Sequence, residues 1–131
     1  MKGWLFDNSA AARERLSPFR EQLNELSGKL CVCPVIQLER RYSARSASEY
    51  DAISEQLTSG LVVVEEAPDA FSRALELQRD LAHHHGMWHR IPIPDLLIAV
   101  TALHHGLGIV HVDSDFDKIA EVRPLVARRL G

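Results

Sequence analysis

Short apolar runs alternate with longer amphipathic stretches along the chain. Four runs rich in large apolar or β-branched residues predict strands, at Gly3–Phe6, Leu30–Val32, Leu61–Val64 and Ile109–Val112. We expect Leu61–Val64 to be covered on both faces, because its apolar residues are continuous. Helical segments separate the runs, and such an alternation favours a small parallel α/β sheet of about four to five strands flanked by helices.

The segments between the runs carry helix-start and helix-stop residues. We expect helices over Ala10–Leu16, from Phe19 toward Gly28, over Pro34–Arg45, Glu49–Leu57 and Pro68–His85, from Pro94 to His105, and over Phe116–Glu121. Helical spacing places Val35, Leu38, Glu39 and Tyr42 on one stripe, which we expect to face inward, and gives the long helix an inner face of Phe71, Ala74, Leu75, Leu77, Gln78 and Leu81. The segment from Gly86 to Pro94 is irregular, and Arg128-Arg129 are interpreted as a basic tail.

Composition narrows the class of protein. With 131 residues, 46% of them hydrophobic and 25% charged, the chain is expected to form one compact domain over residues 1–131. No apolar run approaches the length of a membrane span or a signal peptide, so we expect a cytoplasmic protein. Cys31 and Cys33 are interpreted as small buried hydrophobic residues, since neighbours at that spacing are poorly placed for a disulfide.

Carboxylates stand where the surrounding residues are apolar. Asp7 and Asp113 each follow a predicted strand, while Glu39 and Asp95 lie on predicted helices. Strands of a parallel sheet bring their carboxyl ends to one edge, where ligands bind. Acids that converge there repel one another unless a cation neutralises them, and oxygen ligands suit Mg²⁺ or Mn²⁺. The pattern therefore predicts a metal site for phosphate chemistry.

Basic residues and histidines offer further candidates. Arginines dominate the positive charge between residues 13 and 45, and bidentate arginine suits phosphate contacts, although ordinary surface charge is an equal alternative. The candidates for such phosphate contacts are Arg13, Arg40, Arg41, Arg45 and Arg90. A zinc site at His83–His85 with His89 is disfavoured, because consecutive helical residues point about 100° apart. We interpret Glu65, Glu66 and Asp117 as solvated.

Four motifs carry the acids in order: WLFDNSA at 4–10, LER at 38–40, IPDLLIA at 93–99 and HVDSDFDKIA at 111–120. These motifs give the chain a resemblance to PIN-domain ribonucleases of the VapC toxin type. It implies a PIN-like fold in which Asp7, Glu39, Asp95 and Asp113 are catalytic acids, with Asp115 as a further ligand or supporting acid; either Asp113 or Asp115 could touch the metal. Ser9 would hydrogen-bond Asp7 or a metal-bound water, Asn8 replaces the usual Thr and would cap the following helix, and His111 replaces a hydroxyl residue.

The resemblance also implies a function. The expected activity is Mg²⁺- or Mn²⁺-dependent hydrolysis of an RNA phosphodiester, in tRNA or another structured RNA, by an in-line water that leaves a 3′-hydroxyl and a 5′-phosphate. Such a toxin would arrest translation and growth, form a homodimer, be neutralised by a VapB-type antitoxin, and meet operator DNA only through that antitoxin. The alternative is an inactive PIN-fold module that binds RNA or acts as a scaffold.

Overall fold

The protein folds as a five-stranded sheet wrapped by seven helices, counted over the described residues. The computed structural model describes residues 2–14, 16, 18–26 and 28–131. In the sheet, β1 (Gly3–Phe6), β2 (Lys29–Val32), β3 (Val62–Val63), β4 (Gly108–His111) and β5 (Ala127–Arg129) follow the order β3-β2-β1-β4-β5. Every neighbouring pair is parallel. The predicted fold class is thus confirmed.

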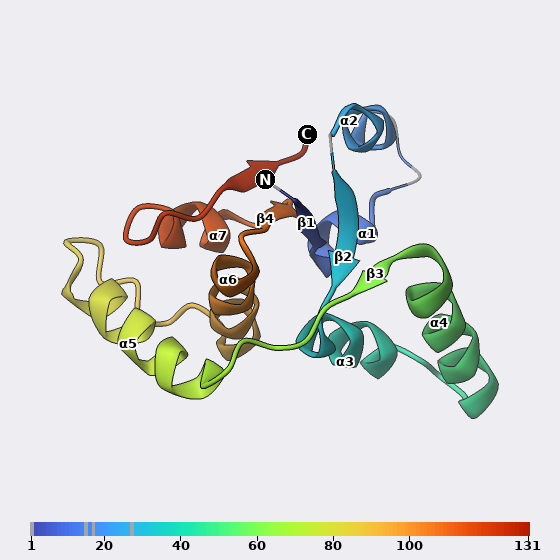
Figure 1. The fold of residues 1–131 in the computed structure, drawn as a ribbon, viewed down its shortest axis with the longest axis horizontal. Helices are drawn as coiled ribbons and strands as arrows, with labels where there is room; N and C mark the ends of the chain where they lie inside the picture. Colours follow the sequence, from blue (N-terminus) through green and yellow to red (C-terminus); the bar gives the residue numbers. More distant parts are fainter. Residues whose placement is uncertain (1, 15, 17, 27) are drawn as a thin grey trace.

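Helices cover the sheet as Figure 1 shows. They are α1 (Asn8–Ala11), α2 (Phe19–Glu25), α3 (Pro34–Tyr42), α4 (Ala47–Gly60), α5 (Ala70–His83), α6 (Ile93–His105) and α7 (Ser114–Ile119). No helix of the described residues has the length and apolar character needed to cross a bilayer.

The central strands divide their side chains between two cores. Leu5 and Ile109 belong to the larger core, which packs against α3, α5, α6 and α7, whereas Phe6 and Val110 belong to a smaller core beside α1 and α2. Successive residues of a strand point to opposite faces, so strands with helices on both sides need apolar residues at every position. Helix α6 is buried from Asp95 to Ala102, because this part of it lies between the sheet and its neighbouring helices.

Several sequence expectations about the ends of elements are wrong. The first helix is Asn8–Ala11 rather than Ala10–Leu16; Arg15 and Ser17 lie outside the described residues. The basic tail contains β5, which pairs with β4. The third strand is a short exposed edge: Val62 is 40% and Val63 50% exposed, because no strand lies beyond β3 in the sheet order.

The expected inner faces of two helices are also wrong. On α3 the buried residue is Ile36, whereas Leu38, Glu39 and Tyr42 are exposed. On α5 the residues Ala74, Leu77 and Leu81 are buried as expected, but Phe71 and Leu75 are exposed. Helical periodicity identifies an apolar stripe without stating which structure covers it. The stripes that point outward leave apolar side chains on the surface.

Candidate metal site

Asp7 ends β1 at the carboxyl edge of the sheet. It is 5% exposed, and its backbone N–H donates to the carbonyl of Val110 on β4 at 3.1 Å. As the N-cap of α1, its carboxylate accepts hydrogen bonds from Ser9 N (3.0 Å) and Ser9 Oγ (2.5 Å). Ser9 Oγ in turn accepts from the N–H of Val112 at 3.0 Å, just past β4. One hydroxyl therefore joins the ends of β1 and β4 and fixes the Asp7 carboxylate.

Asp95 lies in the first turn of α6 and is 7% exposed. Burial raises the pKa of this carboxyl, and the negative charges of four neighbouring acids raise it further, to about 8. Those neighbours, in order of effect, are Asp7, Asp113, Asp115 and Glu39. Because all four of these charges disfavour ionisation, Asp95 lies in a strongly negative electrostatic field.

Asp113 and Asp115 come from the start of α7. Asp113 is the N-cap of this helix, and its Oδ1 accepts from the N–H of Asp115 at 2.9 Å. Burial raises the pKa of Asp115, Asp113 raises it further, and Lys118, whose Nζ is 3.8 Å from Asp115 Oδ1, lowers it. Both aspartates are half-buried, so their outer oxygens can reach a ligand.

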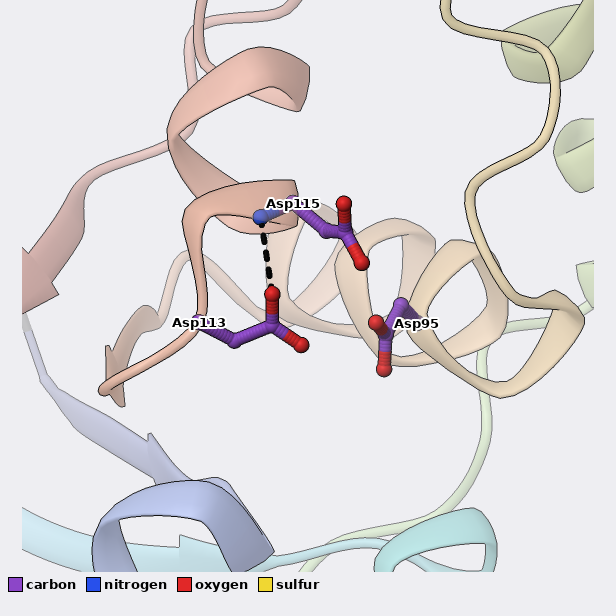
Figure 2. A group of neighbouring side chains, drawn as sticks. All are labelled: Asp95, Asp113 and Asp115. Carbon is purple, nitrogen blue, oxygen red and sulfur yellow. Dashed lines mark hydrogen bonds between the residues drawn. The ribbon is translucent and has the colours of Figure 1, made fainter.

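These three aspartates could hold one cation between them. Asp95, Asp113 and Asp115 each offer an oxygen, and the three oxygens lie within 4.8 Å of one another. Figure 2 shows Asp95 on one side and the two α7 acids on the other, with carboxylates directed toward a shared space. Within the part of the chain that the structure describes, no other group of three or more His, Cys, Asp or Glu side chains lies close enough to hold one ion. Hard oxygen donors and mutual repulsion fit a divalent cation such as Mg²⁺ or Mn²⁺.

Two of the predicted acids lie outside that group of three. Asp7 is close enough for its charge to raise the pKa of both Asp95 and Glu39. Glu39 is exposed on α3, so the expectation that it faces inward among apolar side chains is wrong, although partial burial of its carboxyl contributes most to its raised pKa. The structure thus places all five acids in one electrostatic neighbourhood, with Glu39 at its rim.

Asn8 has a different role from the expected helix cap, which Asp7 provides. Its Nδ2 donates to the Ile36 carbonyl at 3.2 Å, and its Oδ1 accepts from Arg40 Nε at 2.7 Å. The Arg40 guanidinium also lies 5.7 Å from the Phe6 ring centroid, and burial lowers the pKa of Arg40. Asn8 and Arg40 therefore connect the start of α1 to α3.

The other arginine candidates for phosphate contact differ in exposure. Arg13 donates to the carbonyl of Ser9 at 2.8 Å from an exposed position. Arg41 is half-buried, donates to Gln37 at 2.9 Å, and lies over the ring of Tyr50. The remaining two, Arg45 and Arg90, are exposed.

His111 supports the Asp113 backbone from within the core. Its ring is fully buried, its Nδ1 accepts from the N–H of Asp113 at 3.1 Å, and its Nε2 lies 3.3 Å from Asp117 Oδ1. An accepting Nδ1 places the ring proton on Nε2, facing Asp117. Burial lowers the pKa of His111, and Asp117 opposes this. Asp117 is solvated as interpreted, with its side chain 43% exposed, and it also contacts Arg129 Nη1 at 3.4 Å.

Sequence reasoning also missed the role of Glu66. Its Oε1 accepts from the N–H of Val35 at 2.7 Å, at the start of α3, and its Oε2 accepts from Thr101 Oγ1 at 2.5 Å. Thr101 Oγ1 accepts from the N–H of Ala67 at 3.1 Å. Glu66 is therefore a half-buried connection between α3 and α6, and not the solvated strand end that the sequence predicts. The sequence offered one signal, the lone polar residue Thr101 inside the apolar run of α6, which requires a hydrogen-bond partner.

The geometry defines a parallel α/β protein with an acidic site at the carboxyl edge of its sheet. A family model described as "PIN domain" matches residues 4–122. Ribonuclease VapC17 of Mycobacterium tuberculosis is 47% identical over 128 residues, which cover 95% of this chain and 92% of the relative. The chain therefore belongs to the PIN-domain family, in its VapC type.

Solved structures show the same fold at low sequence identity. VapBC2 from Rickettsia felis, bound to a DNA fragment from its promoter, matches with a TM-score of 0.76 at 14% identity, covering 98% of this chain and 99% of that one. VapBC-5 from Mycobacterium tuberculosis matches with a TM-score of 0.71 at 20% identity, covering 99% and 100%. At such identities the likeness concerns the arrangement of strands and helices.

Proposed function

We propose that this protein is a metal-dependent endoribonuclease, the toxin of a type II toxin–antitoxin pair. The observation that supports this most is the convergence of Asp95, Asp113 and Asp115 within 4.8 Å, beside Asp7. The PIN-domain match and the ribonuclease names of the VapC relatives support the same activity. The substrate class we propose is tRNA or another structured RNA, whose cleavage would arrest translation and growth, and residues 1–131 would act as a single PIN domain in the cytoplasm.

The residues would divide the work by position. Asp95 and Asp113, together with Asp115 or Asp7, would hold Mg²⁺ or Mn²⁺, with Glu39 at the rim and Ser9 fixing the Asp7 carboxylate. When bound, the cation would stabilise charge on the phosphoryl group and acidify the attacking water. Asn8 holds α1 on α3 through Arg40, so this arginine suits a positioning role better than contact with RNA.

RNA would approach across positively charged side chains. Arg45 and Arg90 are exposed and carry no hydrogen bond that would hold them away from a phosphate, among those the structure describes. Arg13 and Arg41 are anchored at one end and can still present a charged group. Such contacts position the RNA backbone without reading its sequence, and binding through them should weaken as salt rises.

Partners follow from the same proposal. The structural neighbours are VapBC complexes, which supports a VapB-type antitoxin as partner. In the complex, the antitoxin would be the subunit that binds operator DNA. A homodimer is supported by the exposed apolar side chains of α3 and α5, where Leu38 and Phe71 line a hollow of about 560 Å³. Light scattering of the purified chain, with and without antitoxin, measures both assemblies.

The activity is tested with purified, antitoxin-free protein and total cellular RNA. Wild type, Asp95→Asn and the control Asp51→Asn, which alters an exposed acid on α4, are incubated with Mg²⁺, Mn²⁺ or EDTA. We expect discrete new 5′ ends with either metal for wild type and the control, and none in EDTA or for Asp95→Asn. Absence of cutting by folded wild type under every condition would favour the inactive RNA-binding module instead.

A further inference from the structure

Three aromatic rings gather in the irregular segment between α5 and α6. The His84 ring stacks on Trp88 with centroids 4.1 Å apart and planes at 21°, and it lies 4.0 Å from the ring of His85. We call His84, His85 and Trp88 the ring cluster. A Cβ at Gly86 would lie 2.2 Å from Trp88 Nε1. The indole therefore packs directly against the Gly86 backbone, and any side chain at position 86 would displace it.

Backbone hydrogen bonds hold the ring cluster in place. The N–H of Trp88 donates to the Leu81 carbonyl at 2.9 Å, and the N–H of Met87 donates to the His84 carbonyl at 2.8 Å. Met87 adopts a left-handed conformation, with φ of +50°, which is unfavourable for a residue with a side chain. Surrounding structure must enforce such a conformation, and enforced conformations concentrate at functional sites. The segment is thus built to a fixed shape.

The ring cluster adjoins the acidic site through one lysine. Lys118 Nζ lies 3.8 Å from Asp115 Oδ1 and 5.9 Å from the centroid of the Trp88 ring. The segment that carries the rings also leads directly into α6, whose first turn holds Asp95. In Figure 1 this segment and α7 lie on the same side of α6, and in Figure 2 the chain entering α6 passes beside Asp95.

Packing of the core accounts for only part of this arrangement. Trp88 contacts the larger core and is half-buried, as a structural indole would be. His85 and Met87, however, are exposed and fill no cavity. An exposed aromatic ring, a stacked indole and a lysine beside a group of carboxylates combine the two features that unpaired nucleotides require, a stacking surface and a cation for the phosphate.

We propose that the ring cluster and Lys118 bind an unpaired nucleobase and the adjoining phosphate of the RNA, next to the scissile bond. This inference rests on the proposed ribonuclease function and adds the residues that select a single-stranded region within the substrate. Paired bases hide their faces inside a helix, so a stacking surface favours loops and ends over duplex. His85 is the outer ring that a base can reach without displacing another side chain.

Binding is measured first, independently of cleavage. The chain has two tryptophans, so Trp4→Phe leaves Trp88 as the fluorescent reporter. In an Asp95→Asn background with Mg²⁺, a uridine-rich single-stranded oligoribonucleotide should quench Trp88 emission, and the same sequence as a duplex should quench it much less. Adding His85→Leu or Trp88→Leu should weaken binding roughly 5- to 150-fold. Because Trp88→Leu removes the reporter, its binding is measured by fluorescence anisotropy of labelled RNA. His104→Leu, an exposed histidine at the opposite end of α6, should change it less than about twofold.

The outcomes separate the two proposals. Unchanged affinity in folded His85→Leu, with folding checked by circular dichroism, would overturn the role of the ring cluster even if Trp88→Leu proved unstable. If wild type cuts RNA, His85→Leu in the otherwise wild-type chain should raise KM with little change in kcat, because a stacked base is bound equally before and during reaction. If wild type does not cut but His85→Leu loses binding, the nuclease proposal fails together with the placement beside a scissile bond, whereas the binding of an unpaired base by the ring cluster stands.

Discussion

Replacing Asp95 with Asn should stabilise the metal-free protein, and more so as the pH rises. The folded-state pKa of Asp95 is about 8, against an ordinary value of 3.8. A carboxyl with a raised folded-state pKa binds its proton more tightly when folded, so its penalty is absent below pH 3.8. The penalty grows as the pH rises from 3.8 toward 8 and is constant above pH 8.

The magnitude follows from the size of the pKa shift. One pKa unit corresponds to about 1.4 kcal/mol. The raised pKa of Asp95 therefore lowers the free energy of unfolding by at most about 4 kcal/mol at pH 7 and by about 2 kcal/mol at pH 5. Movement of side chains and entry of water reduce such penalties, since the effective dielectric constant at protein sites is about 20. We expect a measured gain of about 1 to 3 kcal/mol for Asp95→Asn at pH 7.

The assay is urea unfolding in EDTA at pH 5 and pH 8, followed by circular dichroism. The midpoint for Asp95→Asn should exceed that of wild type at pH 8 by more than at pH 5, while Asp51→Asn, an exposed control, should shift neither. Adding Mg²⁺ should raise the wild-type midpoint and leave Asp95→Asn nearly unchanged, because a cation that binds the folded state stabilises it by mass action. Equal midpoints for wild type and variant at pH 8 would refute the electrostatic reasoning.

Two further variants test the hydrogen bonds that surround the site. Ser9→Ala removes the bonds to Asp7 and Val112 and should lower the free energy of unfolding by about 1 to 3 kcal/mol; an unchanged urea midpoint would show that the hydroxyl does not join the strands. Glu66→Gln replaces one of two acceptor oxygens with a donor and should lower the free energy of unfolding by about 1 to 2 kcal/mol. A double-mutant cycle with Thr101→Val should show coupling between the two side chains, and strict additivity would contradict the bond between them.

The sheet could be predicted because its signals are local. Apolar runs that end in Asp7 and near Asp113 mark the two central strands, since a strand covered on both faces is apolar at every position. The edge strands gave weaker signals. β3 is two residues long and exposed, and β5 carries arginines because solvent reaches one side of the sheet edge.

The inward faces of α3 and α5 could not be predicted from periodicity. Leu38 on α3 and Phe71 on α5 repeat at helical spacing with their neighbours, yet they are exposed and line a shared hollow. A stripe of apolar residues indicates a surface suited to burial, and the periodicity does not tell whether the chain's own core or another molecule covers it. The hydrogen bonds of Glu66 and Arg40 leave little local signal beyond the lone Thr101 of α6, because each joins residues 31 to 35 positions apart.

The aspartates of the site were conspicuous in the sequence because each follows a strand or lies at the start of a helix, and this placement also explains how the fold tolerates them. Asp7 and Asp113 are the N-caps of α1 and α7, and Asp95 lies in the first turn of α6. Helix starts present unpaired N–H groups and a partial positive charge, which favour a carboxylate by a few tenths to about 1 kcal/mol each. Three such contributions are smaller than the combined effect of burial and of repulsion by the neighbouring acids, which raises the pKa of Asp95 to about 8. The helix starts therefore position the carboxylates without neutralising them, and the charge that remains favours a divalent cation.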